Sequence, residues 1–158
     1  MRKCVVSLPV LMALWASASL AHGADRGLAK VTLARKAISI DYGRPSLGGR
    51  DMLSRLPPGE SWRMGADADT TLKTETDLDF GSTMAPRGEY VLTARRSAEG
   101  KWTLVLSNSD RTVEVPLAEQ KVVESVEVFT IELGGQGSKG QFLMKWALLA
   151  LSAPFTAK

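Results

Sequence analysis

The sequence predicts an all-β fold, a single-domain antiparallel β-sandwich with one long connection rich in Gly, Pro and Arg and at most a short helix. Three observations predict this class. Apolar and polar residues alternate with a period of two over most of the chain, as in half-buried strands. Turn-forming residues separate the alternating segments at short intervals. Only two segments carry helical features.

The first predicted strands lie in the N-terminal half of the chain. Residues 30–33 and 37–42 alternate, and this places Ile38 and Ile40 along one strand face. Residues 70–76 are rich in threonine, a β-branched residue that packs well on a pleated surface. We therefore expect strands on both sides of a long connection.

A hairpin is predicted after this connection. Residues 88–94 and 101–106 are strand-like, and residues 97–100 between them end in a glycine, which is typical of a tight turn. Residues 112–115 form a further short strand. We expect it to stop at Pro116, because proline cannot donate to the hydrogen-bond ladder of a sheet.

The remaining segments include the two with helical features. Residues 122–133 alternate and predict a strand. Residues 51–56 are compatible with one helical turn that has Asp51 as its N-cap and the following Pro-Pro as its stop. Residues 141–151 are rich in Leu, Met and Ala, whose propensity alone favours a helix. The all-β pattern favours a strand there, buried on both faces.

Residues 1–21 are predicted to be a cleaved signal peptide. Arg2 and Lys3 are basic, an apolar core follows them, and Ser19 and Ala21 fit the small-residue positions of a signal-peptidase site. The apolar core is shorter than the ~20 residues that a membrane-spanning helix needs. We therefore expect an exported protein, periplasmic or extracellular, whose mature chain (residues 22–158) is one domain without a membrane span.

Charge and cysteine content limit the function classes. The formal net charge is +3, and Arg2 and Lys3 contribute two of these charges, so residues 22–158 carry +1. Such a balance does not indicate nucleic-acid binding. The one cysteine, Cys4, lies in the predicted signal peptide, so the mature chain has no thiol for a disulfide, a redox pair or a metal.

Several kinds of catalytic and cofactor site are excluded. His22 is the single histidine and would be the mature N-terminus, where we expect a frayed end rather than half of a copper site, which needs a second histidine. With no other histidine and no cysteine, Ser-His-Asp and Cys-His arrangements and ordinary zinc sites are excluded. Residues 135–140 match the dinucleotide glycine pattern, but no βαβ unit surrounds them and a hairpin turn is expected. Asp67 and Asp69 begin like a calcium loop, but Leu72 replaces its invariant glycine, which leaves only a looser site of loop oxygens. We expect no metal, no cofactor and no catalytic motif.

Short blocks along the chain resemble a known family. They are YGRP at 42–45, GR at 49–50, LPPG at 56–59, WR at 62–63, GAD at 65–67, TT at 70–71, PRGEY at 86–90, WTLV at 102–105 with Asn108, FTI at 129–131, and Trp146 with PF at 154–155. Together they resemble a family of secreted bacterial proteins known as domain of unknown function 2911. The resemblance covers nearly all of residues 22–158 and implies a secreted, mostly β domain. It implies no activity and no catalytic residues.

Residues 42–71 contain the candidate site. Loops of this length are uncommon in compact domains unless they are functional or disordered, and the many Gly and Pro residues here argue against disorder. A guanidinium group offers a planar fork of donors to carboxylate, phosphate or sulfate, and a tryptophan offers a stacking face to a sugar. The functional interpretation is a pocket for an anionic or saccharide ligand. Its candidate residues are Tyr42, Arg44, Arg50, Trp62, Arg63, Asp67 and Asp69.

The structural interpretation of the same block is a clamp. A long connection leaves backbone carbonyls without ladder partners, and arginines paired with Asp67 or Asp69 would supply donors to them. Trp62 would then plug one end of the sandwich. Other aromatic residues lie within strand patterns and are predicted in the core. They are Tyr90, Trp102, Phe129 and Trp146.

Three functions follow from these interpretations. The leading one is a non-catalytic secreted binding or scaffold domain, whose partner would be an acidic small molecule or a glycan. The first alternative is a carboxylate-dependent hydrolase or lyase of the envelope that uses Glu60, Asp67 and Asp69. The second alternative is a protein–protein interaction domain of the envelope that acts through a sheet edge or an exposed patch.

Overall fold

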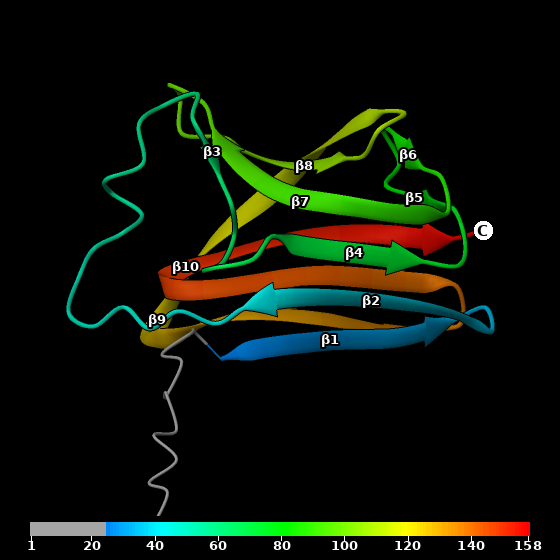
Figure 1. Cartoon of the computed structure of the whole chain (residues 1–158), viewed down its shortest axis with the longest axis horizontal. Coiled ribbons are helices and arrows are strands. Elements are labelled where there is room, and N and C mark those ends of the chain that lie inside the picture. The colour runs from blue at the N-terminus through cyan, green and yellow to red at the C-terminus, as the bar shows by residue number, and fades with distance from the viewer. Residues whose placement is uncertain (1–24) are drawn as a thin grey trace, which may run out of the picture.

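The structure, a computed structural model, describes residues 25–158, and the predicted signal peptide at 1–21 lies outside them. The described residues form strands and contain no helix, which confirms the predicted all-β fold (Figure 1). They therefore include no helix that is long and apolar enough to cross a membrane. The strands are β1 (Arg26–Leu33), β2 (Lys36–Gly43), β3 (Ser61–Trp62), β4 (Thr70–Thr74), β5 (Leu78–Asp79), β6 (Met84–Ala85), β7 (Gly88–Arg96), β8 (Trp102–Ser107), β9 (Thr112–Gln136) and β10 (Lys139–Ala157).

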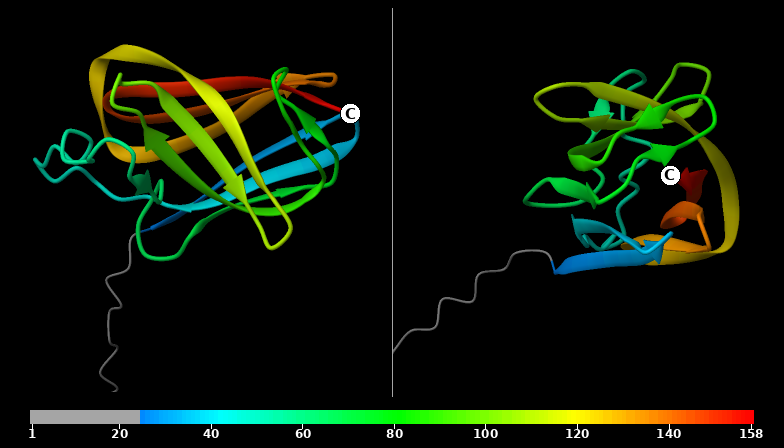
Figure 2. Two further views of the ribbon diagram at one scale, coloured as in Figure 1. Left: turned by 90° about the horizontal axis from the view of Figure 1, so that it is seen from above. Right: turned by 90° about the vertical axis from the view of Figure 1, so that its right-hand side faces the viewer.

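The strands form one antiparallel sheet in the order β1-β2-β4-β7-β8-β9-β10-β5-β6, and β3 pairs with β7 outside this path. The sheet folds back on itself, so that β1 and β2 lie on the opposite side of the molecule from β7 and β8 (Figure 2). Strand β9 runs from one side to the other. Its first part pairs with β8 and its second part with β10. The core lies between the two sides.

The N-terminal hairpin is closed by a turn that no sequence signal indicated. Strands β1 and β2 pair up to Leu33 and Lys36, which leaves Ala34 and Arg35 as the turn. Both turn residues have positive φ, 49° and 63°, as a two-residue type I′ turn requires. The N–H of Ala34 donates to the carbonyl of Gly137 at 2.8 Å. The neighbouring β9–β10 turn thus helps to hold two non-glycine residues in a conformation that they rarely adopt.

Both predicted hairpin turns are present. Strands β7 and β8 pair along their length, and the N–H of Ser97 donates to the carbonyl of Lys101 at 2.8 Å. Gly100 has a φ of 83°, which explains the glycine at the end of this turn. Strands β9 and β10 pair up to Gln136 and Lys139, so the glycine-rich segment is a hairpin turn, as predicted.

The prediction that a strand stops at Pro116 is wrong, because β9 continues through it to Gln136. Pro116 lies opposite Thr103 of β8, while pairing with β10 begins only at Ala118. Pro116 therefore has a ladder neighbour on one side. A proline whose nitrogen faces the open side of a strand removes no ladder bond.

The prediction of a C-terminal strand is confirmed, because residues 141–151 belong to β10. Buried and exposed side chains alternate along most of β10, and Leu149, Ala150 and Leu151 are buried in succession. Burial on both faces is thus limited to the middle of the strand. Pairing with β9 overrides the helical propensity of this segment.

Residues 51–56 form a turn rather than a helix. The N–H of Ser54 donates to the carboxylate of Asp51 at 3.1 Å, so the predicted capping contact exists. The N–H of Leu56 reaches the carbonyl of Leu53 at 3.3 Å. Pro57 and Pro58 follow directly and prevent further helical bonds.

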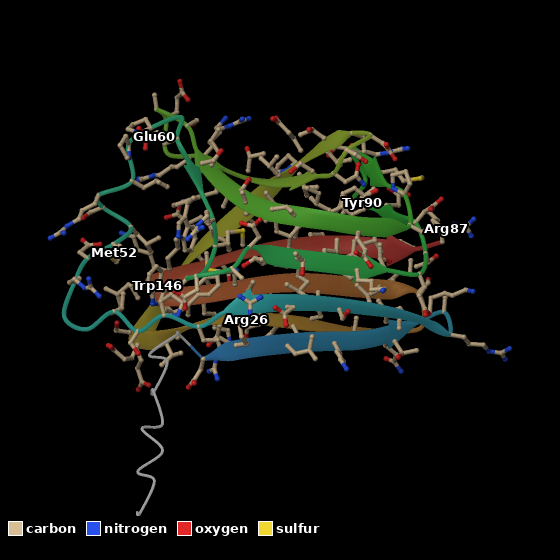
Figure 3. The ribbon with its side chains drawn as sticks, in the orientation of Figure 1. Arg26, Met52, Glu60, Arg87, Tyr90 and Trp146 are labelled. Atoms are coloured by element: carbon tan, nitrogen blue, oxygen red, sulfur yellow. The ribbon has the colours of Figure 1, made fainter. Side chains whose placement is uncertain are left out.

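The core contains the aromatic residues that the strand patterns assigned to it. Tyr90, Trp102, Phe129 and Trp146 are at most 4% exposed. The hydroxyl of Tyr90 donates to the carbonyl of Pro86 at 2.6 Å, which satisfies the polar end of a buried side chain (Figure 3).

Gly43, at the end of β2, provides a test of how the long connection packs. A Cβ atom at Gly43 would lie 2.2 Å from the carbonyl oxygen of Ala66, a backbone atom. We expect Gly43→Ala to lower the free energy of unfolding by about 2 kcal/mol, a fall in Tm of roughly 5–10 °C. The control is Gly134→Ala, because a Cβ there meets nothing within 4 Å. Equal melting temperatures for the two variants, measured by circular dichroism, would contradict this packing.

Candidate functional site

The connection between β2 and β4, residues 44–69, first runs along β9. Ser46 forms a bridge with Val128. The N–H of Leu47 donates to the carbonyl of Glu127, and the N–H of Phe129 donates to the carbonyl of Pro45, both at 2.9 Å. The connection thus extends the sheet by a short third partner for β9.

The connection then turns outward and returns to the sheet at β3 (Figure 1). The N–H of Gly59 donates to the carbonyl of Arg96 at 2.8 Å, and Ser61 and Trp62 pair with β7. The outward segment, residues 48–58, is therefore held at both ends by backbone bonds. Met52 lies in this segment and Glu60 just after it, and both are labelled in Figure 3.

Trp62 is half-buried and lies within a cluster of aromatic rings. It stacks on Trp146 with ring centroids 5.7 Å apart and an interplanar angle of 7°. It meets Phe129 edge-on at 5.4 Å and Trp102 at 6.3 Å. Trp62 therefore fastens the connection to the core, as the structural interpretation expects of a plug.

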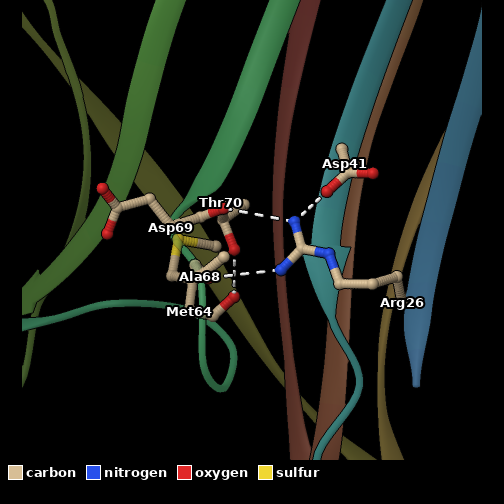
Figure 4. A network of polar contacts seen from close by, with 6 residues as sticks. All are labelled: Arg26, Asp41, Met64, Ala68, Asp69 and Thr70. Carbon is tan, nitrogen blue, oxygen red and sulfur yellow. Dashed lines mark hydrogen bonds and ion pairs between the residues drawn. The ribbon is translucent and has the colours of Figure 1, made fainter. Parts of the chain in front are cut away.

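An arginine that sequence reasoning missed clamps the end of the connection (Figure 4). The guanidinium of Arg26, on β1, pairs with the carboxylate of Asp41 on β2. It also donates to the carbonyls of Ala68 and Asp69, each at 3.3 Å. The predicted clamp chemistry is therefore present, but neither its arginine, Arg26, nor its carboxylate, Asp41, belongs to the connection. Beside it, the hydroxyl of Thr70 donates to the carbonyl of Met64 at 2.7 Å.

The seven predicted site residues do not converge on one pocket. Tyr42 is buried and its hydroxyl donates to the carbonyl of Ile131 at 3.2 Å. Arg44 is half-buried, and its Nε atom is buried without a hydrogen-bond partner. Trp62 belongs to the aromatic cluster. The other four are exposed, and they are Arg50, Arg63, Asp67 and Asp69.

Arg50 alone of these seven lines the large cleft of the described chain. This cleft has a volume of about 670 Å³ and lies between the connection and strands β9 and β10. Glu60, Asp67 and Asp69 do not line it. Its lining residues are Leu47, Gly49, Arg50, Asp51, Leu53, Ser54, Arg96, Trp102, Glu119, Lys121, Ser125, Glu127, Ala147, Leu148 and Leu149.

Two of the three carboxylates in the cleft are engaged within the protein. Glu127 accepts a hydrogen bond from the N–H of Gly48 at 2.9 Å. Asp51 accepts one from the N–H of Ser54, and this bond lowers the pKa of the Asp51 carboxyl. Both carboxylates therefore serve the fold of the connection.

The three cations of the cleft are not engaged in this way. Within residues 25–158, Arg50, Arg96 and Lys121 form no ion pair. The guanidinium of Arg96 lies over the ring of Trp102 at 5.9 Å, and its Nε atom is buried without a hydrogen-bond partner. The cleft therefore presents three cations that form no ion pair, beside three carboxylates of which two are hydrogen-bonded to the backbone. Such an arrangement can bind an oxyanion.

Arg96 and Lys121 were missed because each ends or interrupts a strand pattern far from the connection in sequence. The pairing of β3 with β7 and the bond from the N–H of Gly59 to the carbonyl of Arg96 bring Arg96 beside the connection. No local pattern around Lys121 differs from that of an ordinary exposed strand residue.

A second hollow, of about 350 Å³, lies on the outer face of β2, β4, β7 and β8. Its charged groups are paired within the protein. Lys73 contacts Glu89 at 2.9 Å, and Asp41 is held by Arg26. The described residues contain no group of three or more His, Cys, Asp or Glu side chains that could hold a metal ion. The large cleft is therefore the stronger candidate site.

Comparison with known proteins identifies a family. The family model described as Protein of unknown function (DUF2911) matches residues 25–155, nearly all of the described chain. This match confirms the resemblance predicted from the short sequence blocks. No curated protein and no solved structure gives a significant match.

Replacement of Arg26 tests the clamp at the end of the connection. Its side chain is 35% exposed and that of Asp41 is 49% exposed, so solvent screens much of the attraction. We expect Arg26→Ala to lower the free energy of unfolding by about 1 kcal/mol, since two carbonyls and one carboxylate lose a charged donor. Chemical denaturation measures this change.

The control for Arg26→Ala is Lys73→Ala, whose ion pair with Glu89 is 70% exposed on both sides and bonds no connection carbonyl. It should leave the denaturation midpoint unchanged. If Arg26→Ala also left the midpoint unchanged, Arg26 would not be a clamp.

Proposed function

The chain belongs to the family described as Protein of unknown function (DUF2911), and we propose that it is a non-catalytic binding domain that takes an anionic ligand in the cleft beside its long connection. The family description names no activity, so the proposal is argued from the site. One observation carries it: Arg50, Arg96 and Lys121 line one cleft, and none of them forms an ion pair within the described residues.

The state of the Arg96 side chain supports this proposal. A buried donor without a partner costs free energy, commonly about 1–3 kcal/mol. The Nε atom of Arg96 is such a donor, and the side chain lies at the wall of the cleft. A ligand oxygen that reached this atom after a change of the Arg96 rotamer would remove this cost.

The shape of the cleft also supports a ligand site. Its volume of about 670 Å³ falls within the range of small-molecule sites, roughly 300–1,000 Å³. Apolar side chains make up part of its wall and a few charged groups line the rest, as such sites require. By contrast, no observation favours the hydrolase or lyase alternative, because no two carboxylates of the cleft are shown to form a catalytic pair.

We propose further that the protein is exported. The support comes from residues 1–21, where basic Arg2 and Lys3, an apolar core and the small residues Ser19 and Ala21 follow the order of a signal peptide. The binding domain would then act in the periplasm or outside the cell.

Export predicts the N-terminus of the mature protein. Mass spectrometry of the protein recovered from its bacterial host should find a chain that begins at His22, because cleavage is expected after Ala21. Arg2→Glu with Lys3→Glu should slow this processing. A full-length chain beginning at Met1 in the soluble fraction of the cell would contradict export.

Ligand binding predicts stabilisation by anions. Benzoate, glucuronate, succinate, phosphate and sulfate would be added in turn to the purified protein in a thermal-shift assay. An anion present at 100 times its Kd should add ~2.7 kcal/mol to the free energy of unfolding, a shift of several degrees. Arg50→Ala with Lys121→Ala should raise that Kd tenfold or more.

The matched control is Arg63→Ala. Arg63 is an exposed arginine of the same connection and does not line the cleft. It should bind the anion as the wild type does. Equal binding by the double variant and the wild type would move the site elsewhere, and no shift with any anion would contradict the proposed function.

A further inference from the structure

We propose that the ligand of this cleft is an amphiphilic carboxylate, with an aliphatic body on the leucine-lined wall and its carboxylate at the cations. The inference rests on the proposed function and names its ligand class. It is carried by the kind of apolar residue in the cleft and by the exposed apolar side chains on the segments that form it.

The apolar part of the cleft wall is mainly aliphatic. Leu47 and Leu149 are buried, and Leu53 and Ala147 are partly buried against the core. These side chains offer apolar surface without donors or acceptors. An aliphatic chain laid on them gains ~0.8 kcal/mol for each methylene that it buries.

Exposed apolar side chains gather at the same place. Among the described residues, five large hydrophobic side chains are exposed, and three of them lie on segments that form the cleft. Leu148, which lines the cleft, is 54% exposed, and Met52 is 41% exposed between two lining residues. Val123 is 99% exposed, between the lining residues Lys121 and Ser125. Leu148 thus adds exposed apolar surface to the cleft itself, which a ligand can cover.

An irregularity of the β9–β10 pair creates this exposure. Leu149 pairs with Lys121, and the next pair is Ala147 with Val126. Leu148 alone therefore lies opposite residues 122–125, and the ladder is interrupted between the two pairs. Ala147 has a φ of 52°, which marks the bend. Bulges of this kind redirect side chains next to functional sites.

The aromatic residue of the cleft argues against a saccharide. Sugars bind by stacking on open aromatic faces and through hydroxyl contacts all around the ring. Trp102 is only 4% exposed, and the guanidinium of Arg96 lies over its ring. Trp62 and Trp146 stack on each other and do not line the cleft. An aliphatic wall with cations at one part of it fits an amphiphile better.

The charged end of the ligand follows from the cations. The guanidinium fork of Arg96 suits the two oxygens of a carboxylate, and the ring of Trp102 restricts its position. Arg50 and Lys121 add positive charge from the two sides of the cleft, the connection and β9. The lining also holds three carboxylates, but Asp51 and Glu127 are hydrogen-bonded to the backbone of the connection, so the donors of the three cations stay available to a ligand.

The test is a series of straight-chain carboxylates, namely acetate, butyrate, hexanoate, octanoate and decanoate, titrated below their micelle-forming concentrations into the purified protein by calorimetry. Each two added methylenes that enter the cleft should tighten Kd about tenfold. Octanol should bind at least tenfold more weakly than octanoate, because it lacks the charge. Glucuronate should bind more weakly than octanoate.

Two matched variants separate the apolar contact from the fold. Leu148→Ser should weaken decanoate about fivefold and leave acetate unchanged. Leu28→Ser is the control, because Leu28 is 55% exposed on β1 and does not line the cleft. It should bind the whole series as the wild type does.

The outcomes distinguish this inference from the proposed function. A Kd that is independent of chain length, or tighter binding of glucuronate than of octanoate, would overturn the amphiphile and leave an anion site. Binding to vesicles of anionic phospholipid without binding of monomeric carboxylates would also overturn the amphiphile, and it would indicate that the protein binds a membrane surface. Absence of binding for every anion would overturn both proposals.

Discussion

The arrangement of the whole domain depends on the backbone bonding of β9. This strand of 25 residues pairs with β8, then with β10, and also accepts the start of the connection through Ser46. Because one strand serves three partners, the two sides of the folded sheet and the long connection share one continuous backbone. Phe129 of β9 lies at the junction, completely buried, with Tyr42, Trp62 and Trp146 around it.

The connection has two parts with different physical roles. Its second part stabilises the fold. Trp62 stacks in the core, and Gly65 and Ala66 lie close to the backbone of Gly43. Arg26 donates hydrogen bonds to the carbonyls of Ala68 and Asp69. Its first part makes fewer such contacts and forms one wall of the cleft. The block that the sequence singled out therefore divides into a clamp and a site wall, and most of the predicted site residues belong to the clamp or to the exposed surface beside it.

Local signals predicted the strands well because buried and more exposed side chains alternate along most of them. Period-two alternation located β2, β7, β8 and most of β9, and glycine located two hairpin turns. What failed depends on pairing between distant segments. Pro116 is tolerated because of an open edge, and Ala34 and Arg35 adopt a glycine-like turn that Gly137 supports. The role of Arg26 could have been predicted from the sequence. The hairpin register that places Arg26 opposite Gly43 also places Asp41 two residues along on the same face. The role of Arg96 could not have been predicted in this way, because β3 pairs with β7 only in the folded chain.

Glu127 explains why the cleft retains unpaired cations. Its carbonyl accepts the N–H of Leu47 at 2.9 Å and the indole N–H of Trp146 at 3.3 Å, and its carboxylate accepts the N–H of Gly48 at 2.9 Å. One residue thus joins β9, β10 and the connection, and its carboxylate is hydrogen-bonded to the backbone of the opposite wall. If Glu127 instead formed an ion pair with Arg50, Arg96 or Lys121, the walls would lose this bond. The paired cation would then be less available to a ligand. The bond that positions the two walls therefore also keeps the carboxylate of Glu127 out of an ion pair with the cations of the cleft.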